Sequence, residues 1–182
     1  MGRKFLLAVA AIAAASPAAA AVSVLGSSSA RLCYLAAESR SKPLPDSLRE
    51  CNEAITHDAL SDNDLTATLV NRGILKARLG NVDEAIADYD LALRNDPNEA
   101  EAYLNKGFAL LNRTDAAQQA VPMFDSALAK RTRKPALAYY GRAMANELTG
   151  RAAAAYHDYR EASRIDPKWR EPKADLARFR VE

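Results

Sequence analysis

Small and aromatic residues recur along this chain at a nearly constant spacing. Glycines stand 34 residues apart at Gly73, Gly107 and Gly141. Three further columns repeat every 35 residues: Ala85, Ala120 and Ala155; Tyr89, Phe124 and Tyr159; Ala92, Ala127 and Ala162. Pro97 is matched by Pro167, two periods later. Self-similarity at this period predicts a solenoid of stacked helical hairpins.

Each column has a physical reason. Glycine and alanine suit places where two helix backbones approach too closely for a larger side chain. The aromatic residue follows the alanine by four positions, so both lie on one face of the second helix of a hairpin. There the ring is expected to fill the gap between hairpins. The pairs Asp96-Pro97 and Asp166-Pro167 suit the start of a following helix, as an N-cap and a first-turn proline.

The three units share one pattern with small departures. They read Leu69-x2-Arg72-Gly73-x2-Lys76 with Ala85-x3-Tyr89, Tyr103-x2-Lys106-Gly107-x2-Leu110 with Ala120-x3-Phe124, and Leu137-x2-Tyr140-Gly141-x2-Met144 with Ala155-x3-Tyr159. This resembles the tetratricopeptide repeat, whose pattern is W-x2-L-G-x2-Y, A-x3-F and P. Arg72, Lys76 and Lys106 replace apolar residues of that pattern, and the turn between paired helices lengthens from unit to unit.

The resemblance implies an all-α fold, a right-handed superhelical stack of helical hairpins. Residues 61–166 are expected to hold three repeats, at about 64–97, 98–132 and 133–167. Residues 168–182 should form a C-terminal capping helix, because Leu176 and Phe179 give it one apolar side and an end repeat cannot leave its apolar face in water. Pro122 lies inside an expected second helix and should delay its start or bend it.

The N-terminus has the features of an export signal. In Met1–Ala21, Arg3 and Lys4 precede an apolar stretch, and Ala19-Ala20-Ala21 offers a cleavage site before Val22. The alternative is an uncleaved membrane anchor, since the uncharged run 5–29 is long enough to span a bilayer. Residues 22–29 are expected to be a flexible lead-in. Export from a bacterial cell predicts a periplasmic location.

Residues 30–60 are expected to form a helical hairpin without the repeat columns. Its two helices are broken by the sequence SKPLPD, and Cys33 and Cys51 lie symmetrically about that turn. An antiparallel hairpin would bring the two thiols level, and an exported chain with an even cysteine count favours a disulfide. Free buried thiols are the alternative.

Nothing in the sequence indicates catalysis. Two histidines, His57 and His157, have no paired spacing for a metal site, and no Ser-His-Asp, HExxH, Cys-x-x-Cys or phosphate-loop pattern is present. We therefore expect a non-enzymatic protein without a cofactor or metal. The chain carries 25 basic and 23 acidic residues, and loss of Arg3 and Lys4 with the leader would leave it neutral. Neutrality gives no support to nucleic-acid or anionic-membrane binding.

A helical wheel centred on Gly73 places a polar stripe opposite it on the first helix of each unit. In the family that surface lines the concave groove. Asparagine can bond both the N–H and the C=O of an extended peptide, and tyrosine adds apolar area. The candidate partner-binding residues are Asn71, Arg78, Asn105, Phe108, Asn112, Tyr139, Arg142 and Asn146. The alternative is a merely solvated surface.

The resulting hypothesis is an exported, non-enzymatic adaptor that binds a protein segment in the concave groove. Two alternatives stay open: a self-associating assembly protein, and a binder of a small ligand or cell-wall fragment. No nucleic-acid partner and no stable membrane insertion after signal cleavage are expected.

Overall fold

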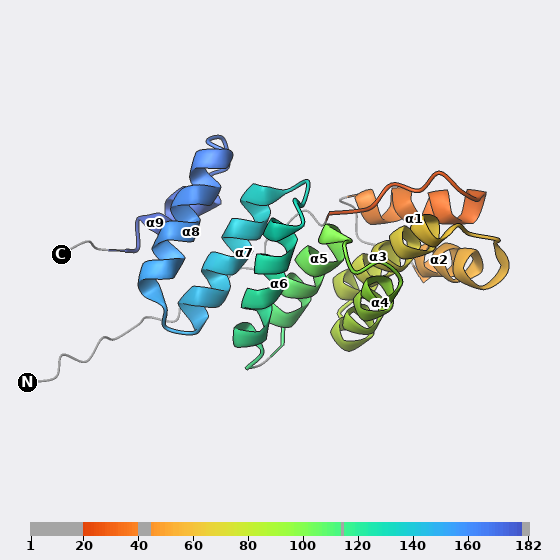
Figure 1. The fold of residues 1–182 in the computed structure, drawn as a ribbon, viewed down its shortest axis with the longest axis horizontal. Helices are drawn as coiled ribbons and strands as arrows, with labels where there is room; N and C mark the ends of the chain where they lie inside the picture. The colour runs from red at the N-terminus through yellow and green to blue at the C-terminus, as the bar shows by residue number, and fades with distance from the viewer. Residues whose placement is uncertain (1–19, 40–44, 114, 180–182) are drawn as a thin grey trace, which may run out of the picture.

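The protein is a row of helical hairpins (Figure 1). The computed structural model describes residues 20–39, 45–113 and 115–179. All regular elements in those ranges are helices: α1 (Ser28–Glu38), α2 (Pro45–His57), α3 (Asp62–Arg78), α4 (Val82–Asn95), α5 (Ala100–Leu111), α6 (Ala117–Ala129), α7 (Pro135–Leu148), α8 (Ala152–Ile165) and α9 (Glu171–Leu176). The predicted all-α architecture is confirmed. The expected leader lies mostly outside the described residues.

The repeat columns form the core between the paired helices. The rings of Tyr89, Phe124 and Tyr159 are 0–1% exposed, and every alanine of the two alanine columns is fully buried. A methyl group added to Gly73 would lie 2.5 Å from the Tyr89 ring, and one added to Gly107 would lie 2.8 Å from the Phe124 ring. In these two units the glycine therefore makes room for the ring of its own second helix, because a Cβ there would overlap it.

The third hairpin has a different register from the one expected. A methyl group on Gly141 would lie 2.4 Å from Phe124, which belongs to the preceding hairpin. Ala143 instead packs with Ala155 and Tyr159 and takes the place that Gly73 has in the first unit. Unit three thus follows unit one by 70 residues rather than by 68.

The turns explain this shift. Gly80 and Gly150, also 70 residues apart, both have positive φ, at 89° and 76°, and end the first helix of units one and three. The turns after α3 and α7 have equal length, and only the one after α5 is longer. The expectation that the turn lengthens from unit to unit is therefore wrong. The sequence does not distinguish a glycine that makes room for a ring of its own hairpin from one that makes room for a ring of the preceding hairpin.

The N-terminal hairpin contains the predicted disulfide. Cys33 of α1 and Cys51 of α2 are joined, with Cα atoms 4.8 Å apart, and both are fully buried. They belong to the apolar cluster that includes Leu69, Val70 and Tyr89. The crosslink therefore fastens α1 and α2 where they pack against the first repeat.

At the other end, a short helix closes the stack. Leu176 and Phe179 pack against Ala155 and Tyr159, and the Trp169 ring lies 4.7 Å from that of Tyr140. The helix α9 is only six residues long, shorter than the expected capping segment. In α6, which starts at Ala117, Pro122 lies inside the helix. Among the described residues, no helix combines the length and apolarity needed to cross a membrane.

Candidate functional site

The candidate site is the surface formed by α3, α5 and the start of α7, which we call the first-helix face. The chain's own residues 20–25, here named segment 20–25, cross this face before α1 begins (Figure 1). They were expected to belong mainly to a flexible lead-in. They lie instead against the helices through contacts with residues far along the chain, because two predicted groove asparagines bond their backbone.

Asn71 and Asn105 each hold both polar groups of one backbone residue, and we call this pair the asparagine clamp. Val22 donates its N–H to Asn71 Oδ1 at 2.9 Å, and Asn71 Nδ2 donates to the Val22 carbonyl at 2.7 Å. Ala20 donates its N–H to Asn105 Oδ1 at 3.4 Å, and Asn105 Nδ2 donates to the Ala20 carbonyl at 3.1 Å. The side-chain amide thus acts as a neighbouring β-strand would.

The geometry of an extended chain explains why these two residues are held. Alternate residues point their N–H and C=O groups to the same side, so positions 20 and 22 face one row of partners. Asn71 and Asn105 lie 34 residues apart, one on each of two adjacent first helices. Bonds to backbone atoms depend on backbone conformation and only indirectly on side-chain identity. The clamp therefore holds this segment by its extended backbone rather than by its side chains.

Side chains of segment 20–25 alternate between the protein and solvent. Ala20 is 1% exposed and Val24 is 7% exposed, whereas Leu25 is 97% exposed. Val22 packs beside two apolar clusters, and Ser23 is exposed. The inward positions thus carry only small or β-branched side chains, which leaves little room for a larger residue at position 20.

Charged side chains bind segment 20–25 at two further residues. Leu25 donates its N–H to Asp64 Oδ1 at 3.1 Å, and Arg133 Nη2 donates to the Ala21 carbonyl at 3.0 Å. Glu101 holds Arg133 in turn, because its carboxylate accepts from the Arg133 backbone N–H at 2.8 Å and from Nε at 3.2 Å. Charged side chains therefore bind Ala21 and Leu25, while neutral amides bind Ala20 and Val22.

The carboxyl groups of Glu99 and Glu101 lie next to each other, beside Arg133. Burial and, to a smaller extent, its hydrogen bond with Glu101 raise the pKa of Glu99 to about 7. Burial also acts to raise the pKa of Glu101, but the hydrogen bond from the Arg133 N–H and the nearby guanidinium lower it overall. Glu101 is thus the ionised member that binds Arg133, and Glu99 is the member that holds a proton near neutrality.

Three other predicted groove residues lie elsewhere on these helices. Arg78 donates from Nη1 to the Ser39 carbonyl at 2.7 Å and so fastens α3 to the end of α1. Phe108 packs edge-on against Phe124, with ring centroids 5.0 Å apart. Asn112 is exposed at the end of α5. Among the described residues, none of these three is hydrogen-bonded to segment 20–25, and each has a different local role.

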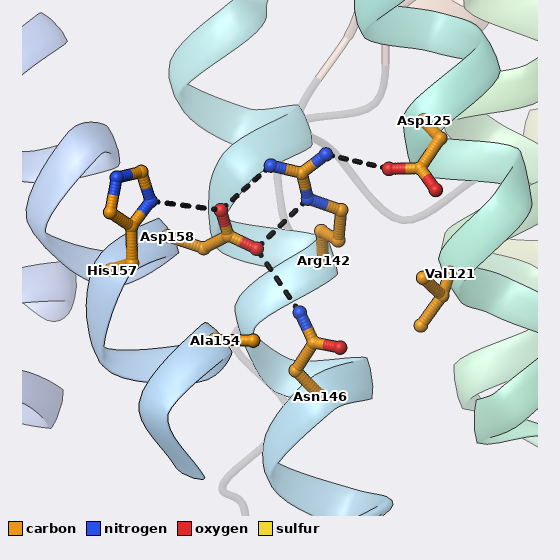
Figure 2. Close-up of a pocket in the computed structure, with 7 residues that line it drawn as sticks. All are labelled: Val121, Asp125, Arg142, Asn146, Ala154, His157 and Asp158. Atoms are coloured by element: carbon orange, nitrogen blue, oxygen red, sulfur yellow. Dashed lines mark hydrogen bonds and ion pairs between the residues drawn. The ribbon is translucent and has the colours of Figure 1, made fainter. Parts of the chain in front are cut away.

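The three predicted residues of unit three face the second helices. Figure 2 shows Arg142 between two acids: its Nε and Nη2 donate to Asp158 of α8, and its Nη1 donates to Asp125 of α6 at 2.6 Å. Asn146 donates to Asp158 at 3.1 Å, and the Arg142 guanidinium lies 5.3 Å from the Tyr139 ring centre. Hydrogen bonds to Asp158 raise the pKa of Arg142, although burial opposes this.

The shifted register accounts for their position. Arg142 and Asp158 each follow Arg72 and Asp88 by 70 residues, and Arg72 forms the same two-bond pair with Asp88, at 2.8 and 2.6 Å. The residue that follows Asn71 by 70 is Gly141. Unit three therefore offers a glycine where the first two units offer clamp asparagines.

The residues drawn in Figure 2 line an open hollow around Arg142. Its volume is about 380 Å³. Its polar members are mutually bonded, and His157 Nδ1 lies 3.7 Å from Asp158. The hollow is thus lined by the ion-pair network that joins α6, α7 and α8. Within the described part of the chain, no group of three or more His, Cys, Asp or Glu side chains could hold a metal ion.

Sequence reasoning missed several parts of the site. The sequence identified Asn71 and Asn105 but not the segment that they bind. It also did not identify Asp64 and Arg133, which bind Leu25 and Ala21 of that segment. One signal was present: in residues 22–24 two β-branched valines flank a polar serine, a short alternation that is typical of an extended strand. That short alternation directly follows the expected leader in a chain of helices, and it therefore does not by itself predict an extended segment.

Comparison with known families agrees with the repeat columns. The family described as TPR repeat matches residues 75–112, and the one described as tetratricopeptide repeat matches residues 136–168. The chain is therefore a tetratricopeptide-repeat protein. Proteins of this class are typically scaffolds for protein–protein interaction rather than enzymes.

Solved structures show the same fold. A double mutant named MamA RS-1 ArsTM superimposes with a TM-score of 0.67 at 23% identity, covering 82% of each chain. MamA residues 41 to the end from Desulfovibrio magneticus RS-1 gives a TM-score of 0.66, also at 23% identity and 82% of each chain. At this identity the likeness concerns the fold alone. No curated protein sequence matches the chain.

Proposed function

We propose that the protein binds an extended segment of a partner protein on its first-helix face, through the asparagine clamp. The observation that carries this is the bonding of Ala20 and Val22, each through both its N–H and its C=O, to Asn105 and Asn71. The protein thus already holds an extended backbone in this way. Interaction with protein partners is also the general role of the repeat class.

We further propose that the protein acts in the bacterial cell envelope, without catalytic activity, after export and cleavage following Ala21. The basic and apolar leader supports export, and the Cys33–Cys51 disulfide suits an oxidising compartment such as the periplasm. N-terminal sequencing of the protein isolated from the periplasm tests this. We expect the sequence to begin at Val22, and recovery of the uncleaved chain in membranes would support the anchor instead.

The test of binding uses a clamp variant and a matched control. Asn71→Ala/Asn105→Ala removes both clamp amides, and Asn81→Ala/Asn112→Ala removes two amides from exposed positions. Each tagged protein is checked for helical content and then used to recover partners from envelope extract. We expect the clamp variant to lose partners that the wild type and the control retain. Equal recovery by a folded clamp variant would overturn the proposed function.

A further inference from the structure

We infer that segment 20–25 is an internal ligand of the asparagine clamp, which a partner segment must displace. This rests on the proposed function, since it names what occupies the same site and what competes for it. Each N–H and C=O that a partner backbone would need from Asn71 and Asn105 is engaged by Val22 or Ala20. In the uncleaved chain, a second backbone has no clamp amide to bond unless it displaces this segment.

The short connection to α1 makes this occupant effective. Ser27 caps α1 by accepting from the Ala30 N–H at 3.1 Å, so the segment is anchored only a few residues from Val22. A tether of that length gives an effective concentration on the order of mM. A free peptide with the same contacts must compete against that concentration.

The internal ligand also describes the chemistry of the partner. Ala20 is almost fully buried in the cluster that includes Leu104, Leu137 and Ala138, and Val24 is buried with Ala54 and Ala67. A competing segment should therefore be extended and should carry a small residue at the first inward position. Small or β-branched apolar residues should follow two and four positions later, with freedom at the outward positions.

Cleavage of the leader would change the occupancy. If the Ala21–Val22 bond is hydrolysed, with water giving a carboxylate on Ala21 and an ammonium on Val22, Ala20 and Ala21 leave. Asn105 and Arg133 then lose their partners in segment 20–25, while Val22 remains at Asn71. The uncleaved chain is thus the closed form, and the Asn105 half of the clamp is where a partner first enters the cleaved form.

The experiment opens the clamp in the full-length chain. Ala20→Glu places a large charged side chain at a closed inward position, and Val22→Pro removes the N–H that Asn71 accepts. The matched control, Ser23→Pro/Leu25→Glu, makes the same kinds of change at outward positions. The probe is a fluorescein-labelled peptide of residues 20–27, AAVSVLGS. Binding is measured by fluorescence anisotropy.

We expect the Ala20→Glu/Val22→Pro variant to bind the probe at least tenfold more tightly than the wild type and the control. Adding Asn71→Ala/Asn105→Ala should remove that binding. Val22→Pro alone, a milder change outside every helix, should give an intermediate gain. Equal binding by wild type and opened variants, or no binding by any opened variant, would overturn the inference.

The peptide-binding experiment and the partner-recovery experiment can fail independently of each other. Probe binding to the opened variant needs no natural partner, whereas partner recovery from extract needs one. If the probe binds but the clamp variant retains its partners, the internal ligand stands and the proposed function fails. If partners are lost but the opened chain binds the probe no better than the wild type, the proposed function stands and the internal ligand fails.

Discussion

Asn71 is the most constrained polar residue of the clamp. Its side chain is fully buried, and both its oxygen and its nitrogen are bonded to Val22. A buried amide left without partners costs about 1–3 kcal/mol. The pair of bonds therefore contributes to folding as well as to the shape of the site.

Replacement of Asn71 by its acid isostere tests this. In Asn71→Asp the carboxylate can still accept from the Val22 N–H, but it has no N–H for the Val22 carbonyl and brings charge into a buried place. We expect the unfolding free energy to fall by about 2–3 kcal/mol. Urea denaturation measures it. Asn112→Asp, at an exposed site, should change it by less than about 0.5 kcal/mol. Equal effects would contradict the assignment.

Glu99 should make stability depend on pH. Its folded-state pKa of about 7 lies above the usual value of 4.5, so the folded chain keeps a proton that the unfolded chain releases. This group therefore lowers the unfolding free energy as pH rises from about 4.5 to about 7. In Glu99→Gln the side-chain oxygen can still accept from the Glu101 N–H.

The comparison of wild type with Glu99→Gln isolates this group. We expect the variant to gain about 1 kcal/mol relative to the wild type between pH 5 and pH 8, after allowance for solvent screening of a half-buried carboxyl. Urea midpoints at the two pH values provide the measurement. A difference that stays constant with pH would show that Glu99 titrates normally.

At the scale of the helices, the register of the third hairpin makes a distinct prediction. Gly141→Ala would press a methyl group into Phe124 of α6 and should cost about 1–3 kcal/mol. Phe124→Leu should relieve part of that cost, whereas Tyr159→Leu should not. Double-mutant cycles measured by thermal unfolding decide between them. Coupling of Gly141 to Tyr159 would restore the 34-residue register.

The disulfide of the first hairpin is a second prediction at this scale. Cys33 and Cys51 are 18 residues apart, and a crosslink over a loop of this size stabilises by about 3 kcal/mol in the chain-entropy model. Cys33→Ala/Cys51→Ala should therefore lower the melting temperature, and added reductant should lower that of the wild type but not of the variant. A wild type insensitive to a strong reductant during unfolding would count against this contribution.

At the scale of the whole molecule, the sequence specified the repeat architecture well. Buried alanines and rings such as Tyr89 and Tyr159 recur because each hairpin repeats one packing problem, and repetition is visible in a single sequence. The spacing of Cys33 and Cys51 about a turn was equally informative. The position of Gly141 led to the wrong register, because the spacing of glycines does not reveal which neighbouring ring occupies the space beside each one.

The candidate site was only partly visible. Asn71 and Asn105 were identified because they share one face of adjacent first helices. Their occupant bonds across 49 and 85 residues of sequence, through side chains, so neither helical periodicity nor strand pairing reveals it. Arg142 and Asn146 were misplaced because the assumed register was two residues off. Long-range polar contacts need the folded chain.

Asn71 and Asn105 hold an extended backbone on the first-helix face. Residue-resolved amide hydrogen exchange of the full-length protein, followed by NMR, tests it most directly. The structure predicts slow exchange for Val22, whose N–H is bonded to buried Asn71, and fast exchange for exposed Ser23, with the protection of Val22 lost in Asn71→Ala. Equally fast exchange at Val22 and Ser23 in the wild type would contradict the claim.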